Sequence, residues 1–200
     1  MQQQDKPLKT SNKIAGLSIT ALLVELGGII LMALIIVIPI KYFLIQPFIV
    51  KGASMEPNFH EGEYLIINEI GWKFKGIKRG EVLVFKNPGN KKDYFIKRVV
   101  GLPNEKVEIK GGRITIFNQE HPQGMVLDES EYLPEGRVTS GMIVVELTDD
   151  EFFVLGDNRS ASSDSRYWGP LPEKLVVGKA WVRAFPFGKF TVFSSEHNQE

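Results

Sequence analysis

Two residues of this chain, Lys97 and Ser54, have the side chains needed for nucleophilic catalysis by a serine whose base is a lysine. Lys97 lies at the centre of the run 94–101, which otherwise has the composition of a buried strand. Because side chains two positions apart share one face of a strand, Phe95 and Val99 lie on the face of Lys97. An amine among apolar groups has a pKa lowered from about 10.4 toward roughly 7–8, where it can accept a proton. Lys97 is therefore a candidate general base; the alternative is a lysine that extends from an edge strand to water.

The candidate nucleophile, Ser54, follows two small residues, Gly52 and Ala53, and precedes the segment 55–57, Met-Glu-Pro. Small residues let a substrate backbone approach closely, and a proline restricts the turn that follows. A serine in such a segment is otherwise an ordinary surface or capping residue. Only a fold that brings Ser54 to Lys97 makes it a nucleophile.

The segment 156–166 is dense in short polar side chains and alternating charges, and it directly follows the apolar run 152–155. It is either a solvated loop or a hydrogen-bonded network. If Lys97 acts as a base, its amine needs an orienting partner, and the hydroxyl of Ser162 can supply one. Carboxylate–guanidinium pairs would then hold the loop as a supporting shell. The charged residues concerned are Asp157, Arg159, Asp164 and Arg166.

The elements that must position these residues are short β-type segments separated by glycine, proline and asparagine. We expect strands at 64–67, 81–85, 94–100, 143–147, 152–155 and 175–182. Gly111-Gly112 predicts a hairpin turn between 106–109 and 113–116, because both central residues tolerate positive φ. The polar, turn-rich stretch 119–140 is predicted to be a surface excursion. The pattern indicates a mainly β domain.

The segment from Ala21 to Phe43 is almost wholly apolar, and a spanning helix needs about 20 such residues. A cleavable secretion signal and a buried core helix are the alternatives. A signal has an apolar region of about 7–15 residues and ends at a small-x-small site, whereas Lys51 occupies the third place before a cut after Ala53. The pattern favours a retained anchor, and the slight excess of lysines before it favours a cytoplasmic N-terminus. We expect a cytoplasmic segment 1–20, a transmembrane anchor 21–43, a β-rich domain 44–193 and a polar tail 194–200.

Composition excludes several classes of function. The 200 residues have a formal net charge of zero and no basic tract, so nucleic-acid binding is not expected. Cysteine is absent, which excludes disulfides, thiolate zinc sites and cysteine nucleophiles. The three histidines are scattered without metal-ligand spacing, so neither a metal nor a cofactor is expected.

Four segments resemble, in order and content, the motif boxes of bacterial type I signal peptidases, the leader peptidases with a serine–lysine dyad. They are 54–58, 79–85, 97–103 and 156–166, and the resemblance, with the anchor, covers about 21–181. It implies a membrane-bound serine endopeptidase that removes signal peptides from exported preproteins outside the cytoplasmic membrane. The implied fold is a coiled antiparallel β-sheet catalytic domain with an N-terminal transmembrane helix. The implied topology is single-pass, with an extracytoplasmic catalytic domain.

The resemblance also implies roles for individual residues. Ser54 is the nucleophile, whose N–H helps hold the oxyanion, Lys97 is the general base, and Ser162 orients the lysine. Gly52 stands where some relatives have a serine that donates a second hydrogen bond to the oxyanion. The remaining implied residues are Asp164 and Arg166 as a supporting pair, Asp157 and Arg159 as structural loop residues, and Met55, Tyr94 and Phe95 as substrate contacts.

The implied partners are the signal peptides of preproteins and membrane lipid, with the export translocon close by. Two rival functions remain. One is a self-cleaving regulatory protease with the same dyad, against which the anchor and the absence of a DNA-binding segment argue. The other is a non-catalytic membrane-tethered β-module that binds an export partner. A eukaryotic-type signal peptidase would have histidine in the place of Lys97.

Overall fold

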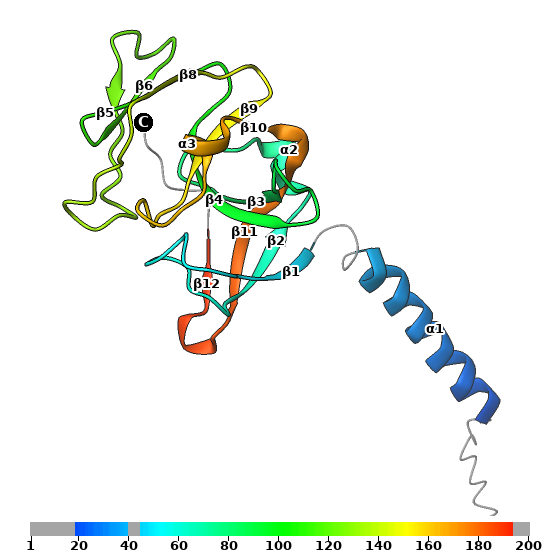
Figure 1. Ribbon diagram of the computed structural model, residues 1–200. Coiled ribbons are helices and arrows are strands. Elements are labelled where there is room, and N and C mark those ends of the chain that lie inside the picture. The colour runs from blue at the N-terminus through cyan, green and yellow to red at the C-terminus, as the bar shows by residue number, and fades with distance from the viewer. Residues whose placement is uncertain (1–18, 40–44, 194–200) are drawn as a thin grey trace, which may run out of the picture. The chain divides into compact units, whose positions relative to one another are not determined.

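The computed structural model describes residues 19–39 and 45–193, which belong to two compact units, Met1–Pro39 and Ile40–Glu200 (Figure 1). Most of the expected N-terminal segment, the end of the expected anchor from 40 to 43 and the expected tail 194–200 lie outside the described residues. The two units are described separately below.

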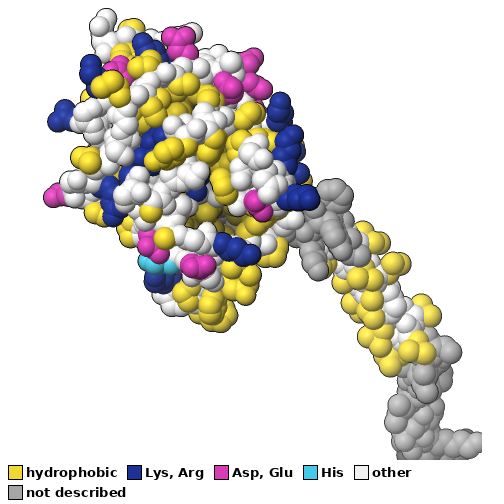
Figure 2. All heavy atoms as spheres, in the orientation of Figure 1, with side chains coloured by type: hydrophobic (Ala, Val, Ile, Leu, Met, Phe, Trp, Pro, Cys, Tyr) yellow, Lys and Arg dark blue, Asp and Glu magenta, His cyan; other side chains and the backbone are white. Residues whose placement is uncertain are grey.

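The first unit contains the helix α1 (Ile19–Pro39). Its side chains are largely hydrophobic, as Figure 2 shows, and Glu25 is its one charged residue. Within the unit, the side chains from Ala21 to Val37 are all exposed. Among the residues that the structure describes, no helix combines the length and the apolar character required to cross a membrane.

The second unit is mainly β, as predicted, and its larger sheet has the strand order β1-β2-β11-β3-β4-β9-β10, with β12 paired to β11. Neighbouring strands are antiparallel throughout. The strands are β1 (Ile45–Ile49), β2 (Tyr64–Asn68), β3 (Val82–Lys86), β4 (Tyr94–Gly101), β9 (Glu151–Leu155), β10 (Leu171–Pro172), β11 (Val176–Phe185) and β12 (Thr191–Val192). Short helical turns connect them: α2 (Gly71–Lys75), α3 (Ser165–Trp168), η2 (Glu173–Leu175) and η3 (Phe187–Lys189).

A smaller antiparallel sheet has the order β7-β6-β5-β8. Its strands are β5 (Lys106–Lys110), β6 (Arg113–Phe117), β7 (Met125–Val126) and β8 (Ile143–Glu146). The predicted hairpin joins β5 to β6, and its glycines, Gly111 and Gly112, have φ of 59° and 80°. The expected surface excursion is more integrated than predicted, because β7 pairs with β6 and Leu127 and Leu133 are buried.

Side-chain alternation along β4 places its apolar residues in three core clusters, of which two lie on opposite faces of the large sheet and the third joins Val100 to the small sheet. Val99 packs with Leu83 and Phe85 of β3 on the face of Lys97. Ile96 packs with Val84 and other buried residues on the opposite face. Each fully buried aliphatic or aromatic side chain contributes roughly 1.5–3 kcal/mol, so both faces hold β4 rigidly.

The large sheet curls, which brings its first strand to β4. Phe48 of β1 meets Tyr94 of β4 edge-to-face, with ring centroids 5.3 Å apart, although β2, β11 and β3 separate the two strands in the sheet order. The chain that leaves β1 therefore starts beside β4. This curl is what places the segment containing Ser54 next to the strand containing Lys97.

Candidate active site

Ser54 and Lys97 meet at the start of the turn that follows β1. Lys97 Nζ lies 2.8 Å from Ser54 Oγ, and it also donates a 2.8 Å hydrogen bond to the carbonyl of Ile96. The Phe95 ring centroid is 5.2 Å from Nζ, and Lys97 is only 3% exposed. The candidate base and the candidate nucleophile are thus within direct proton-transfer distance in a largely apolar setting.

Burial lowers the pKa of Lys97 from 10.5 to about 8. Desolvation is the main cause, because the charged ammonium loses its hydration. The negative charges of Asp164 and Asp157 act in the opposite direction and limit the shift. At pH 7 about a tenth of the molecules therefore carry a neutral amine that is able to accept a proton.

Asn158 holds the turn around Ser54 from the side of the polar loop 156–166. Its backbone N–H donates to the carbonyl of Ser54 at 3.0 Å, and its side-chain Nδ2 donates to the carbonyl of Ala53 at 3.1 Å. The loop reaches this turn because β9 ends at Leu155, where it stops pairing with β4. The first half of β4 therefore has no strand partner on the side of β9.

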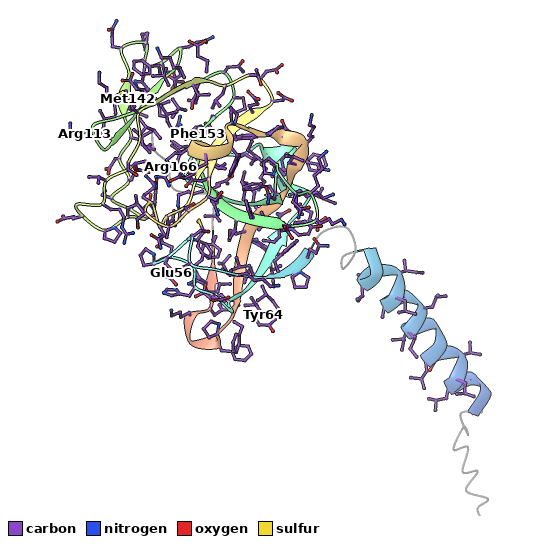
Figure 3. All side chains as sticks on the ribbon, viewed as in Figure 1. Glu56, Tyr64, Arg113, Met142, Phe153 and Arg166 are labelled. Atoms are coloured by element: carbon purple, nitrogen blue, oxygen red, sulfur yellow. The ribbon has the colours of Figure 1, made fainter. Side chains whose placement is uncertain are left out.

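Asp164 and Arg166 form a buried pair at the start of α3; Figure 3 labels Arg166 there. Arg166 donates from Nε and Nη2 to the two Asp164 oxygens at 2.8 and 2.9 Å. Asp164 also accepts the N–H of Gly156 at 3.1 Å, and Arg166 donates to the carbonyl of Arg159 at 2.8 Å. The pair thereby fixes both ends of the polar loop.

Asp157 is fully buried and pairs with Arg98, the residue after Lys97 on β4. Arg98 donates two bonds to the carboxylate, at 2.8 and 2.6 Å, and Asn58 Nδ2 donates a third at 2.8 Å. Arg98 also stacks 4.2 Å from the Tyr132 ring. The sequence suggested charge pairs within the loop itself, but the carboxylate of Asp157 is neutralised from the strand.

Arg159 forms its ion pair with Glu129, in the segment that precedes β8. Its Nη1 donates to Glu129 Oε2 at 2.9 Å, its Nη2 donates to the other oxygen, and Nη1 also contacts Thr139. Nε of Arg159 donates to the carbonyl of Gly156 at 3.0 Å. The excursion 119–140 thus supports the polar loop from behind.

Replacing Arg98 with lysine is expected to lower the free energy of unfolding by about 1–2 kcal/mol. Lysine keeps the charge but loses the two parallel bonds to Asp157 and the stacking on Tyr132. Urea unfolding monitored by circular dichroism measures the change. Arg113→Lys, at an exposed position, is the matched control and should be within about 0.5 kcal/mol of the native protein. An equally small effect at Arg98 would mean that the bidentate geometry does not matter.

Ser162 is buried next to Gly156, and its hydroxyl has no hydrogen-bond partner among the described residues. A Cβ at Gly156 would lie 2.2 Å from Ser162 Oγ and 2.4 Å from the carbonyl oxygen of Ser54. Only glycine therefore allows Ser54 and Ser162 to approach from its two sides. The role of Ser162 in orienting Lys97 stays a prediction, and its hydroxyl is free to take that role.

Comparison with known proteins identifies the family. The family model described as signal peptidase, peptidase S26, matches residues 23–185. A signal peptidase IB from Staphylococcus aureus is 34% identical over 175 residues, which cover 80% of this chain and 88% of the relative. The chain belongs to the signal peptidase family, peptidase S26.

Two further comparisons are with another curated relative and with a solved structure. A probable signal peptidase I-2 from Synechocystis is 34% identical over 182 residues, which cover 88% of this chain and 79% of the relative. The solved structure of a signal peptidase I from Enterococcus faecalis aligns with 26% identity and a TM-score of 0.42, covering 52% of this chain and 95% of that chain. The predicted resemblance to bacterial type I signal peptidases is confirmed, and the chain is a serine endopeptidase. Membership supports removal of signal peptides, and the family is membrane-associated in general.

The backbone around Ser54 in this signal peptidase leaves space for a substrate. Among the described residues, the N–H of Ser54 has no protein acceptor. Gly52, with φ of 77°, is exposed, and a Cβ there would meet no atom within 4 Å. The N–H of Ser54 is therefore unpaired within the described residues, and open space lies beside Gly52.

The three predicted substrate contacts differ in exposure. Tyr94 is 48% exposed at the start of β4, whereas Phe95 is partly buried and packs edge-to-face on Phe85 with ring centroids 6.2 Å apart. Met55 is only 1% exposed and belongs to the core cluster that contains Val84. Their roles stay predictions, and Tyr94 is the most accessible of them.

A well-formed cavity in the described part of the chain lies away from the candidate dyad. It has a volume of about 640 Å³ and is lined by Arg98, Tyr132 and Lys179 among others, but by neither Ser54 nor Lys97. Arg98 lies on the face of β4 opposite to Lys97. Among the described residues there is also no group of three or more side chains suited to hold a metal ion.

Sequence reasoning missed four residues that position this site: Asn58, Arg98, Gly156 and Asn158. The signal for Arg98 was its place one residue after Lys97, which puts it on the opposite face of β4, where a buried charge needs a partner. Asn158 acts largely through its backbone N–H, and Gly156 through the absence of a side chain. Neither a backbone N–H nor the absence of a side chain can be recognised from a pattern of residue types in the sequence.

Proposed function

We propose that this chain is a membrane-anchored signal peptidase that removes N-terminal signal peptides from exported preproteins, with Ser54 as nucleophile and Lys97 as general base. One observation carries the proposal: Lys97 Nζ, buried and with a lowered pKa, lies 2.8 Å from Ser54 Oγ. A lysine in a solvated surface pair would stay charged at pH 7 and would be unable to accept the serine proton.

The geometry supports a defined proton path. Neutral Lys97 donates one N–H to the carbonyl of Ile96, which leaves its lone pair for the hydroxyl proton of Ser54. Ser54 Oγ then attacks the scissile carbonyl, and the C–N bond breaks as the lysine ammonium returns the proton to the leaving amine. Water, deprotonated by the same amine, hydrolyses the acyl-enzyme and restores Ser54. In this proposal Ser162 orients the amine between the two steps.

The N–H of Ser54 is proposed to hold the oxyanion of the tetrahedral intermediates, because it has no acceptor within the described residues. Gly52 carries no side-chain donor, so a second donor at this place is a backbone N–H or water. The rigid turn held by Asn158 costs no reorganisation during the reaction, which is what makes such donors effective.

The substrate segment before the cut is proposed to lie along the first half of β4. That half has no partner from β9, because β9 ends at Leu155 opposite Arg98. An extended peptide is able to add to such an open edge through main-chain hydrogen bonds, with small side chains where the space is shallow. Tyr94 and Phe95 would border the bound peptide, and Met55 would form its floor.

The membrane attachment is proposed to be the apolar segment from Ala21 to Phe43, which extends past the described end of α1. Its length matches the roughly 20 apolar residues of a spanning helix. The N-terminal lysines would keep the preceding segment in the cytoplasm and place the catalytic domain outside. Closeness to the export translocon belongs to this proposal as well.

Cleavage of a preprotein tests the function. The full chain in detergent micelles is expected to cut a preprotein with an Ala-x-Ala site at the bond after the second alanine, as shown by N-terminal sequencing of the product. The control substrate has leucine in place of both alanines and should not be cut. Folded enzyme that leaves both substrates intact would favour the tethered binding module instead.

The pH dependence follows from the lysine. Because only the neutral amine accepts a proton, kcat/KM is expected to rise about tenfold per pH unit below pH 8 and to level off above it. Initial rates on a peptide substrate between pH 6 and 11 measure this profile. A rise that continues to pH 10.5, the ordinary lysine value, would exclude a buried base.

A further inference from the structure

A second cavity, of about 400 Å³, lies at the end of the large sheet where β1 begins. The antiparallel register brings the start of β1, the end of β2, the start of β11, the end of β3 and the start of β4 to this end. Gln46 of β1 and Tyr94 of β4 both contribute to its wall. We call this the lysine end of the domain.

The wall of the cavity is positively charged. Lys73, Lys86 and Lys174 line it, against a single carboxylate from Glu69. None of the three lysines has an ion pair among the described residues, although Lys73 Nζ lies 5.8 Å from the Trp72 ring. Figure 2 shows Lys and Arg side chains gathered along the edge of the domain where α2 lies in Figure 1. Uncompensated ammonium groups around one cavity suit a phosphate.

Chain connectivity keeps this cavity close to the proposed anchor. This step rests on the proposed function, in which the anchor ends at Phe43. Gln46 follows Phe43 by three positions, and a fully extended chain advances at most about 3.6 Å per residue. However the two units are arranged, the cavity wall therefore starts within about 11 Å of the end of the anchor.

We propose that the lysine end binds the phosphate of an anionic lipid headgroup and so holds the catalytic domain against the membrane surface. Lys97 follows Tyr94 by three residues on β4, which is about 10 Å along a strand. A headgroup in the cavity would hold the catalytic amine about one headgroup layer above the acyl chains. A signal peptide that leaves the bilayer would reach Ser54 directly.

The opposite end of the same sheet offers a competing mode of contact. Tyr64 and Phe187 both stack edge-to-face on Phe185, and Phe187 and Phe190 are strongly exposed. Figure 3 labels Tyr64 at this aromatic end. Aromatic side chains favour membrane interfaces, so they would seat the domain without any need for anionic lipid. The ten residues of β11 separate the two ends by about 30 Å. A separate fluorescent label placed at each end can therefore distinguish them.

Fluorescence quenching by a headgroup-attached quencher tests the proposal on the full chain in vesicles. The chain has no cysteine, so Lys91→Cys, in the turn between β3 and β4, and Lys189→Cys, in η3, each give a single labelling site. In vesicles of phosphatidylcholine with phosphatidylglycerol, the label at position 91 is expected to be quenched more than the label at 189. In phosphatidylcholine alone this difference should disappear.

Charge removal is the second arm. Combining Lys86→Gln with Lys174→Gln should weaken docking, measured by quenching at position 91, by about 25-fold, because each lysine near an anionic surface contributes about fivefold. Lys110→Gln with Lys189→Gln removes the same charge from exposed positions away from the lysine end and should change docking less than twofold. Greater quenching at 189, no dependence on phosphatidylglycerol, or equal effects of the two double variants would each overturn the proposal.

Cleavage assays separate this proposal from the proposed function. Quenching does not require catalysis. Quenching at position 91 without cleavage of any preprotein would therefore support the lipid site and contradict the proposed function. Normal cleavage without quenching at position 91 would support the proposed function and contradict the lipid site. If Lys86→Gln with Lys174→Gln raises KM for a short soluble peptide in detergent, the cavity holds substrate instead of lipid, and the proposal fails.

Discussion

Lys97→Met is expected to lower kcat/KM by at least about a thousandfold while the folded protein becomes more stable. Methionine retains the apolar stem but removes the amine that lies 2.8 Å from Ser54 Oγ. Loss of one member of a nucleophile–base pair typically removes nearly all of the catalysis that the pair supplies. Steady-state rates on the Ala-x-Ala preprotein, with circular dichroism on the same samples, measure both effects.

The gain in stability follows from the direction of the pKa shift. The pKa of Lys97 is 10.5 when unfolded and about 8 when folded, so the unfolded chain binds more protons between these values. The destabilising contribution is fully present below pH 8 and disappears as the pH rises through 10.5. At pH 7, Lys97→Met should therefore raise the free energy of unfolding by on the order of 1–3 kcal/mol. At pH 10.5 urea unfolding should show a much smaller difference.

Ser54→Ala is the matched control for this result. It should abolish cleavage to the same extent, because it removes the nucleophile, but it keeps the buried amine and its cost. Its unfolding free energy at pH 7 should stay close to the native value. Equal stability of Lys97→Met and Ser54→Ala would show that burial of the Lys97 amine does not destabilise the fold. Substantial activity in either variant would show that Ser54 and Lys97 are not the catalytic dyad.

Eight of the twelve described strands could be predicted from the sequence because their signals are local, whereas β1, β7, β10 and β12 were not predicted. The alternation around Lys97, the Gly111-Gly112 turn and the apolar run 152–155 each depend on a few adjacent residues, and the observed strands match them closely. The close approach of Ser54 to Lys97 is different. It depends on the curl of the large sheet, seen in the contact of Phe48 with Tyr94, and only the resemblance of four motifs suggested it.

The charge pairs likewise include one that the sequence predicts locally and one that only the fold determines. Asp164 and Arg166 are only two positions apart, so their pairing could be predicted from the sequence. Asp157 has arginines close by in the loop, yet it pairs with Arg98, 59 positions away, because that guanidinium already lies buried on β4. Composition identifies which charges must be neutralised, but the fold decides by which partner.

Gly156→Ala is expected to lower kcat/KM by about a hundredfold and the free energy of unfolding by about 1–3 kcal/mol. The new Cβ would lie 2.4 Å from the carbonyl oxygen of Ser54 and 2.2 Å from Ser162 Oγ. Overpacking in a rigid core has this thermodynamic cost. A shift of Ser54 by about 1 Å is enough for the loss of activity, since catalysis depends on the near-attack geometry.

Gly178→Ala separates the two effects. A Cβ at Gly178 in β11 would lie 2.5 Å from the carbonyl oxygen of Asn68, which is a comparable clash away from Ser54. The two variants should lose similar stability, but only Gly156→Ala should lose activity per folded molecule. Gly188→Ala, with no atom within 4 Å of the new Cβ, should change neither. If Gly156→Ala and Gly178→Ala lose activity equally, the defect is general loosening of the sheet, and Gly156 has no special part in positioning the serine.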